Sequence, residues 1–191
     1  RQRQMCIRDR SDNGGSREGQ ELGTSAYFRT LLAFTGHTDL ESTELDHSRI
    51  DLLGGPRSLA HYPMGWAMAS NTPFRLYKTN THQGGQQVPL IVHWGKGLPS
   101  DKELRHQYQH VTDILPTICE LVGIDIPASK GGEQLPPAAG NSFAGSLTNP
   151  SAESTHPEQY YEMIGHRGIY KDGWSASTIR QPETVFSEEH W

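Results

Sequence analysis

The chain has 191 residues, enough for one domain of ordinary size or for part of a larger one. Its 17 Lys and Arg residues are outnumbered by 22 Asp and Glu residues, and it has no long basic run, so we expect no nucleic-acid partner. Two cysteines exclude a disulfide scaffold or a zinc site built from thiolates. A hydrophobic content of 34% with 20 Gly and 12 Pro predicts a loop-rich fold, and no apolar stretch approaches the roughly 20 residues of a membrane helix.

The first ten residues, RQRQMCIRDR, carry four arginines and no hydrophobic alternation. They run directly into SDNGG, where a loop that closes a buried strand would be preceded by Val, Ile, Leu and Phe. A solvated basic tail is one interpretation of this stretch. We favour the other, in which residues 1–10 are a non-native leader that replaces the preceding strand.

SDNGG, residues 11–15, has two interpretations. Asn-Gly pairs supply the positive backbone dihedrals of tight turns, and on the local sequence alone a turn is favoured. Alternatively, Asp12 and Asn13 offer neighbouring side-chain oxygens to a hard cation. Calcium takes about six to eight oxygens, so two residues supply at most a third of such a site.

Residues 16–88 contain few regular elements. Residues 16–55 are polar and predict a long loop with a short helix near residues 27–34, and prolines 56 and 73 bracket short helical turns with an apolar surface patch. The segment 88–94, VPLIVHW, is short, β-branched and bounded by glycine, which predicts a buried strand.

VTDILPTICELVGIDIP carries the clearest helix signal. Apolar side chains recur at spacings of three and four along it, namely Ile114, Leu115, Ile118, Leu121 and Val122. Thr112 or Asp113 can cap its start, Gly123 stands where a left-handed C-cap residue belongs, and Pro127 prevents its resumption. We expect this helix to pack on the 88–94 strand, as in α/β layers.

The C-terminal part is predicted to be a loop followed by a small sheet. Residues 128–158 are rich in Gly, Pro, Ser and Ala, which is typical of a linker or surface loop. The stretches EQYYEMIG and RGIYKDGWSAST then predict a hairpin, an Asp172-Gly173 turn and a third short strand.

Lys78 and His82 are further candidates for a site. Lys78 lies on a connection ahead of the predicted strand, where its ammonium could reach an anionic ligand, and His82 could act with it as a donor or acid. A solvated lysine beside a surface histidine is the more frequent arrangement for an isolated lysine. The local sequence does not decide between the two.

Four stretches, in order along the chain, resemble the type I sulfatases and, within them, the arylsulfatases. They are SDNGG, PFRLYKTNTHQGGQQVPLIVHW, HVTDILPTICELVGIDIP and YYEMIGHRGIYKDGWSAST. The resemblance implies that Asp12 and Asn13 are calcium ligands and that Lys78 binds sulfate. His82 occupies a variable position of the same motif and is carried over as a further catalytic candidate.

The same resemblance implies that the chain is a C-terminal fragment. The family's N-terminal half holds two further metal aspartates and a Cys-x-Pro/Ala-x-Arg signature whose cysteine becomes formylglycine. The stretch CIRDR has the Cys and Arg of that signature but Arg8 in its middle position, so we do not expect Cys6 to be the nucleophile. The isolated chain is therefore expected to be inactive.

For the fold, the resemblance implies a partial α/β/α sandwich of the alkaline-phosphatase type followed by a small antiparallel C-terminal subdomain. We expect a leader at 1–10, part of the core at 11–127, a linker at 128–158 and the start of the subdomain at 159–191. The implied substrate is a small-molecule or glycan sulfate ester, with calcium and formylglycine in the intact enzyme and a periplasmic or secreted location.

Two alternatives remain open from the sequence. A phosphonate monoester hydrolase or phosphodiesterase of the same superfamily would use similar metal ligands and cationic side chains, since these groups bind a phosphoryl group as well as a sulfuryl group. A non-catalytic binding or structural module is the alternative from a different class.

Overall fold

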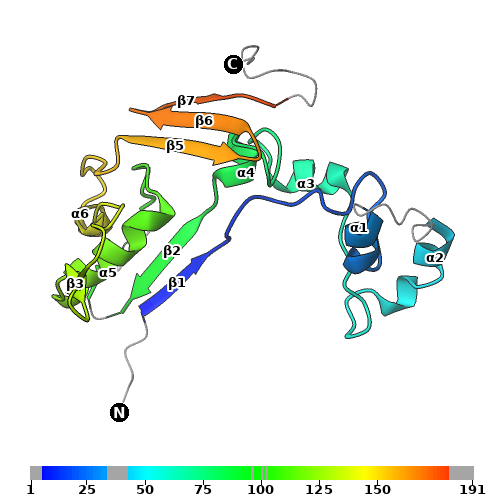
Figure 1. The fold of residues 1–191 in the computed structure, drawn as a ribbon, viewed down its shortest axis with the longest axis horizontal. Helices are drawn as coiled ribbons and strands as arrows, with labels where there is room; N and C mark the ends of the chain where they lie inside the picture. The colour runs from blue at the N-terminus through cyan, green and yellow to red at the C-terminus, as the bar shows by residue number, and fades with distance from the viewer. Residues whose placement is uncertain (1–5, 34–42, 96, 100, 102, 181–191) are drawn as a thin grey trace. The chain divides into compact units, whose positions relative to one another are not determined.

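The computed structural model describes residues 6–33, 43–95, 97–99, 101 and 103–180 (Figure 1). Short helices and strands are mixed along the chain, as predicted for an α/β protein. The helices are α1 (Tyr27–Ala33), α2 (Thr43–His47), η2 (Ile50–Leu52), α3 (Met64–Ser70), α4 (Gln83–Gln86), η3 (Val111–Asp113), α5 (Ile114–Val122) and α6 (Ala144–Thr148). The strands are β1 (Cys6–Arg10), β2 (Leu90–Trp94), β3 (Ser129–Lys130), β4 (Glu133–Gln134), β5 (Glu158–Met163), β6 (His166–Lys171) and β7 (Trp174–Ser177).

The strands form three small sheets, in the orders β1-β2, β3-β4 and β5-β6-β7. The chain also divides into two compact units. The first unit comprises Arg1–Asp9, Leu90–Tyr160 and Ile169–Ala176, and the second comprises Arg10–Pro89, Tyr161–Gly168 and Ser177–Trp191. This mixture of helices with small sheets is consistent with part of an α/β fold.

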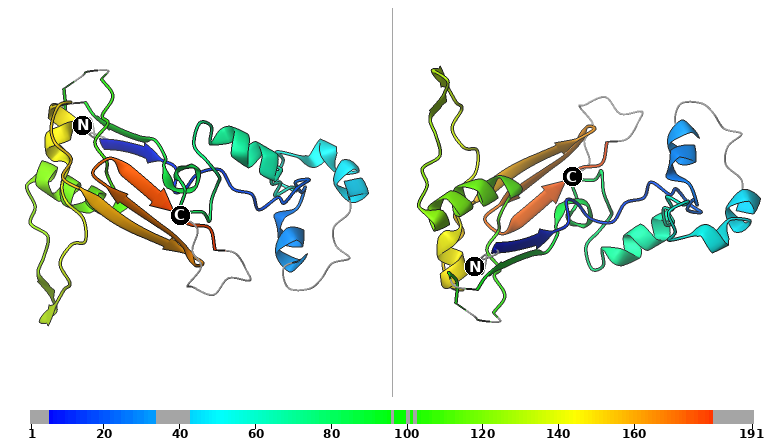
Figure 2. Two further views of the ribbon diagram at one scale, coloured as in Figure 1. Left: turned by 90° about the horizontal axis from the view of Figure 1, so that it is seen from above. Right: turned by 90° about the horizontal axis from the view of Figure 1, so that it is seen from below.

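In the first unit, β1 lies beside β2 in the views of Figures 1 and 2, and the arrows of the two strands point in opposite directions in Figure 1. The strand expected at residues 88–94 is therefore present as β2, but the prediction that it is buried is wrong, because its residues alternate between half-buried and exposed. Cys6–Arg10, which falls in the predicted leader, is a strand despite its polar composition, because sheet pairing uses backbone groups that every residue other than proline carries. Residues 1–5 of that leader lie outside the described part of the chain.

The predicted helix is confirmed as α5, which ends at Gly123 with a left-handed φ of 68°. Its N-cap position is Asp113, one of the two residues predicted, but no side-chain hydrogen bond caps the helix there. The preceding turn η3 has the capping box instead: the His110 side chain accepts from the Thr112 backbone N–H, and the Asp113 carboxylate accepts from the His110 backbone N–H. Among the described residues, α5 contacts η3 and α6.

Asp113, at the start of α5, is a fully buried charged residue, with 0% of its surface exposed. Its carboxylate accepts hydrogen bonds from the backbone N–H of His110 at 2.7 Å and of Asn141 at 2.8 Å. It also lies 2.8 Å from Nδ1 of His156, which is itself buried. One buried carboxylate therefore joins three segments, and these donors satisfy an acceptor that water does not reach.

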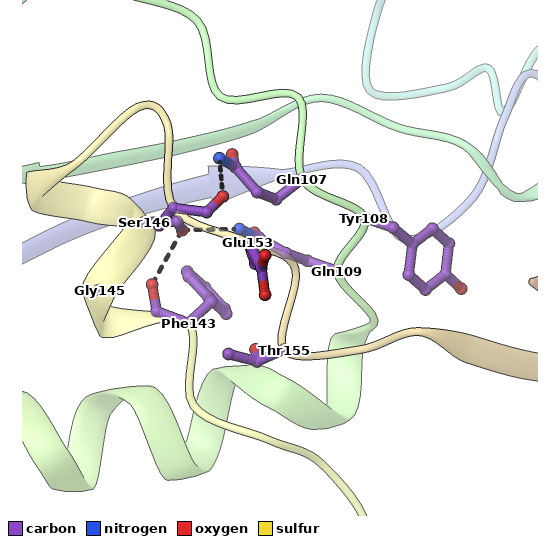
Figure 3. Close-up of a pocket in the computed structure, with 9 residues that line it drawn as sticks. Gln107, Tyr108, Gln109, Phe143, Gly145, Ser146, Glu153 and Thr155 are labelled. Atoms are coloured by element: carbon purple, nitrogen blue, oxygen red, sulfur yellow. Dashed lines mark hydrogen bonds between the residues drawn. The ribbon is translucent and has the colours of Figure 1, made fainter. Parts of the chain in front are cut away.

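A small cavity of about 70 Å³ lies in this unit, beside the start of α6 (Figure 3). Gln109 Nε2 donates to Ser146 Oγ at 3.2 Å along its wall. Gln107 Nε2 donates to the Pro150 and Ala152 carbonyl oxygens, both at 2.7 Å. None of the four site residues predicted from the sequence lines this cavity.

The sheet β5-β6-β7 confirms the predicted hairpins. Ile164 and Gly165 join β5 to β6, with φ of 56° and 86°, and Asp172 and Gly173 join β6 to β7, with φ of 46° and 89°. Two successive positive φ values are typical of the tight turns that match the twist of antiparallel strands.

The second unit holds α1 to α4 in long connections, as the polar sequence of residues 16–55 predicted, and the helix expected near residues 27–34 is present as α1. Within it, Thr24 pairs with His61 as an isolated antiparallel bridge, and the Arg29 guanidinium forms an ion pair with Asp46.

The hydrophobic core of the described residues is small. Its buried apolar side chains are Ala67, Ile114, Phe143 and Ala144. Large apolar side chains are exposed on both units, including Trp66 at 67% and Leu115 on α5 at 57%. None of the described helices combines the length and apolar content needed to cross a bilayer.

Candidate active site

The loop Ser11–Gly15 directly follows β1 and begins the candidate site. Ser11 Oγ donates to the Asn13 carbonyl oxygen at 2.7 Å, and Asn13 Nδ2 donates to the Gly14 carbonyl oxygen at 2.6 Å. The second bond leaves the Asn13 amide oxygen as an acceptor. Asp12 is exposed. The loop therefore presents a carboxylate and an amide oxygen in succession.

The glycines of this loop do not have the role that the turn interpretation assigned to them. Neither Gly14 nor Gly15 has the left-handed φ that an Asn-Gly turn requires. Instead, Gly14 N–H donates to the Gly85 carbonyl oxygen at 3.1 Å. A Cβ on Gly14 would lie 2.8 Å from the Gly84 carbonyl carbon and closer still to its oxygen. The glycine is needed for close approach of two backbones, a property of the fold and not of the local turn.

Two further backbone contacts bring Lys78 to the same loop. Lys78 N–H donates to the Gly15 carbonyl oxygen at 2.9 Å. Asn71 bridges the segments, since its Oδ1 accepts from Gly15 N–H at 2.7 Å and its Nδ2 donates to the Leu76 carbonyl oxygen at 2.9 Å. Leu76 and Thr79 flank Lys78 with positive φ of 65° and 78°. Non-glycine residues hold such values only where surrounding contacts impose them.

The Lys78 ammonium donates to Glu18 Oε1 at 2.8 Å. This hydrogen bond raises the pKa of Lys78, burial lowers it by less, and the Asp12 carboxylate raises it further. The predicted metal-ligand carboxylate of Asp12 therefore lies near enough to the predicted sulfate-binding ammonium to contribute to the pKa of Lys78. The site therefore combines one cation with two carboxylates.

His82 precedes α4 as its N-cap residue. Burial lowers the pKa of His82, and the positive charges of Arg75 and His166 lower it further. Its Nδ1 is buried without a hydrogen-bond partner among the described residues. A neutral imidazole with an unused nitrogen can accept or donate a proton near neutral pH.

The backbone beside His82 is fixed by Thr81, which is 3% exposed. Thr81 Oγ1 donates to the Arg167 carbonyl oxygen at 2.8 Å, and Ser177 Oγ donates to the Thr81 carbonyl oxygen at 2.8 Å. Residues of β6 and β7 thus hold the connection that carries His82.

Of the four residues predicted from the sequence, Asp12, Asn13 and Lys78 belong to one cluster. No hydrogen bond joins Lys78 to His82 within the described parts of the chain. Sequence reasoning missed Glu18 and Asn71, which contact the cluster from elsewhere in the chain. Neither residue stands in a motif, so no local signal marked them.

The cluster suits a hard cation only in part. A carboxylate and an amide oxygen are ligands that calcium prefers, but calcium needs about six to eight oxygens. In the described ranges, no group of three or more His, Cys, Asp or Glu side chains is arranged to hold a metal ion. Asp12 and Asn13 therefore fit as part of a calcium site and do not complete one.

The segment that carries this cluster is similar to known proteins. The family model for sulfatases matches residues 10–124, a range that includes the SDNGG loop, Lys78 and His82. The chain belongs to the sulfatase family. A sulfatase of Formosa agariphila is 28% identical to this sulfatase over 121 residues, covering 63% of the chain and 20% of the relative. An uncharacterized sulfatase of Schizosaccharomyces pombe is 33% identical over 81 residues, covering 42% of the chain and 14% of the relative.

The chain thus corresponds to a fifth or less of the length of these curated relatives. The family match ends at residue 124, so the sheet β5-β6-β7 lies beyond it. Sulfatases act on sulfate esters and generally use calcium and formylglycine. Neither cysteine of this chain stands in a Cys-x-Pro/Ala-x-Arg sequence, so the chain offers no residue for formylglycine.

Proposed function

We propose that this chain is part of an arylsulfatase, and that the intact enzyme hydrolyses aryl sulfate esters to a phenol and inorganic sulfate. Asp12 and Asn13 are two of its calcium ligands, and Lys78 binds a sulfuryl oxygen. The observation that carries the proposal is the backbone pairing of the SDNGG loop with the Lys78–Gly85 segment. Two backbone hydrogen bonds, of 2.9 and 3.1 Å, hold the loop that carries Asp12 and Asn13 beside the segment that carries Lys78.

Each residue has a role that follows from its chemistry. Bound calcium would polarise sulfuryl oxygens, and the Asp12 carboxylate and Asn13 amide oxygen would help to hold it. The Lys78 ammonium stays protonated, because Glu18 raises its pKa, and it neutralises negative charge on the sulfate. Burial and the charge of Arg75 lower the pKa of His82, which favours its neutral imidazole, and in this proposal it exchanges a proton with the ester or with water.

A sulfate monoester suits this cluster because its charge is spread over oxygens. An ammonium with three donors, beside oxygen ligands for a divalent cation, binds such an anion without requiring one fixed orientation. The net charge of -5 does not oppose this, since the field at the oxygens depends on the nearest groups and less on the total.

The test is sulfate release from a chromogenic aryl sulfate by the full-length protein that contains this chain. Lys78→Ala and Asp12→Ala should each lower kcat/KM by roughly 100-fold or more, the range for removing one group that stabilises transition-state charge. Matched controls are Lys130→Ala and Asp125→Ala, because both of these side chains are exposed. Both control variants should retain wild-type activity.

Two outcomes would change the proposal. Cleavage of aryl phosphonates without cleavage of aryl sulfates would assign the protein to phosphoryl chemistry of the same superfamily. Full activity of Lys78→Ala on aryl sulfates would remove Lys78 from the site.

A further inference from the structure

Glu18 is the closest charged neighbour of Lys78 in the candidate site. Their Oε1 and Nζ atoms are 2.8 Å apart, and the side chains are 29% and 37% exposed. An ammonium has three N–H donors, so this bond leaves two for another acceptor. Glu18 therefore does not exhaust the hydrogen-bonding capacity of the lysine.

The Glu18 carboxylate is itself held in place. Ser16 Oγ donates to Oε2 at 2.7 Å and also accepts from the Glu18 backbone N–H at 3.3 Å. Ser16 N–H donates to the Tyr62 hydroxyl at 3.1 Å. His61 Nε2 lies 3.4 Å from Glu18 Oε2. These contacts restrict the carboxylate before any ligand binds.

Both partners are ionised near neutral pH. Burial acts to raise the pKa of Glu18, but hydrogen bonds from Lys78 and Ser16 outweigh it, so the pKa lies below its ordinary value of 4.5. The hydrogen bond to Glu18 likewise holds the pKa of Lys78 above its ordinary value of 10.5. A fixed carboxylate next to a flexible four-carbon side chain restricts where the ammonium can lie.

We propose that Glu18 is a positioning residue for Lys78: its carboxylate fixes the ammonium and keeps it charged, while two N–H groups stay available for a sulfuryl oxygen. This inference rests on the proposed sulfate-binding role of Lys78. The opposing effect is repulsion between the carboxylate and the bound anion. The shared ammonium between them offsets that repulsion, so Glu18 improves the geometry of anion binding and does not increase the net positive charge.

The pairing can be measured without catalysis. Trace acetylation of the 191-residue chain across a pH series, read by mass spectrometry of each lysine, reports the fraction of each amine that is deprotonated. In the wild type, the midpoint for Lys78 should lie above that for Lys130, which is exposed. A Lys78 midpoint equal to or below that of Lys130 would overturn the proposal, and this comparison needs no variant to fold.

Glu18→Gln keeps an acceptor oxygen and removes the charge. It should increase acetylation of Lys78 near pH 9 by roughly two- to fivefold, because a partly exposed ion pair changes an equilibrium by only a few fold. The matched control is Glu158→Gln, which removes the same charge beside Lys171, where both side chains are 63% exposed. Glu158→Gln should leave Lys78 unchanged, and an equal effect of both variants would overturn the proposal.

In the full-length enzyme, Glu18→Gln should move the alkaline limb of the kcat/KM profile to lower pH, because Lys78 loses its proton earlier. A merely structural role for Glu18 would lower activity without moving that limb. Failure of the proposed function is distinguishable: Lys78→Ala would then retain activity, whatever the acetylation data show. Loss of activity in Lys78→Ala with an unshifted limb in Glu18→Gln would reject only the role of Glu18.

Discussion

Gly14→Ala is the substitution that tests the construction of the candidate site most directly. The added Cβ would lie 2.8 Å from the Gly84 carbonyl carbon, closer to its oxygen, and 3.1 Å from Asn71 Oδ1. The nearest atoms are backbone, so relief requires the two segments to separate and weakens the bond from Gly14 N–H to Gly85. Overpacking costs about 1–3 kcal/mol and a lost hydrogen bond about 0.5–1.5 kcal/mol. We expect roughly 2–4 kcal/mol of destabilisation in total.

The assay is urea unfolding of the chain followed by tryptophan fluorescence and circular dichroism. Gly65→Ala is the matched control, because Gly65 lies within α3 and an added Cβ meets no atom within 4 Å. Gly65 is the second residue of α3, so its replacement by alanine should stabilise by no more than the roughly 0.5–1 kcal/mol of a helix interior. A Gly14→Ala protein that unfolds at the wild-type urea concentration would refute the close-approach explanation. In the full-length enzyme, separation of the segments should also lower sulfate release by about 100-fold.

Three further predictions concern stability and association. Asp113→Ala should destabilise the chain by roughly 3–5 kcal/mol in urea unfolding, because the buried His156 ring and two part-buried backbone N–H groups lose their acceptor. Asp125→Ala, at an exposed position, is the control, and equal midpoints would contradict this. The Glu18–Lys78 pair should stabilise the wild type over Glu18→Gln at pH 7. That difference is lost as pH falls through the lowered pKa of Glu18 or rises through the raised pKa of Lys78, and a pH-independent difference would count against the pair. The chain should self-associate with rising concentration in analytical ultracentrifugation, because the apolar face of α5 is exposed; a monomer that melts cooperatively would argue otherwise.

Elements with local signals were predictable from the sequence. The spacing of apolar residues and Gly123 predicted α5 and its end, because helix periodicity and C-capping depend on residues within a few positions. The same holds for the Asp172-Gly173 turn, since Asp and Gly adopt the positive φ of such turns more readily than most residues do. The ordered motifs likewise pointed to the sulfatase family, which the family match confirms.

Amino-acid composition predicted the structure of other segments less well. Residues 128–158 are rich in Gly, Pro, Ser and Ala, yet they contain α6 and the buried side chain of Phe143. Cys6–Arg10 lacks any hydrophobic pattern and is still a strand, because its backbone pairs with β2. In both cases tertiary partners outweigh local propensity.

The sequence by itself determined the family and the short elements whose signals lie within a few residues. It also supplied the candidate site residues, which are Asp12 and Asn13 for the metal and Lys78 for sulfate. Only the tertiary structure decided how they are held. Glu18 and Lys78 are 60 positions apart, and Asn71 lies 56 positions from Gly15. Such pairings depend on which backbones the fold brings within a hydrogen bond of each other, and no spacing along the chain encodes that distance. For the same reason Gly14, which suggested a turn, serves a close contact with a glycine pair 70 residues away in the chain.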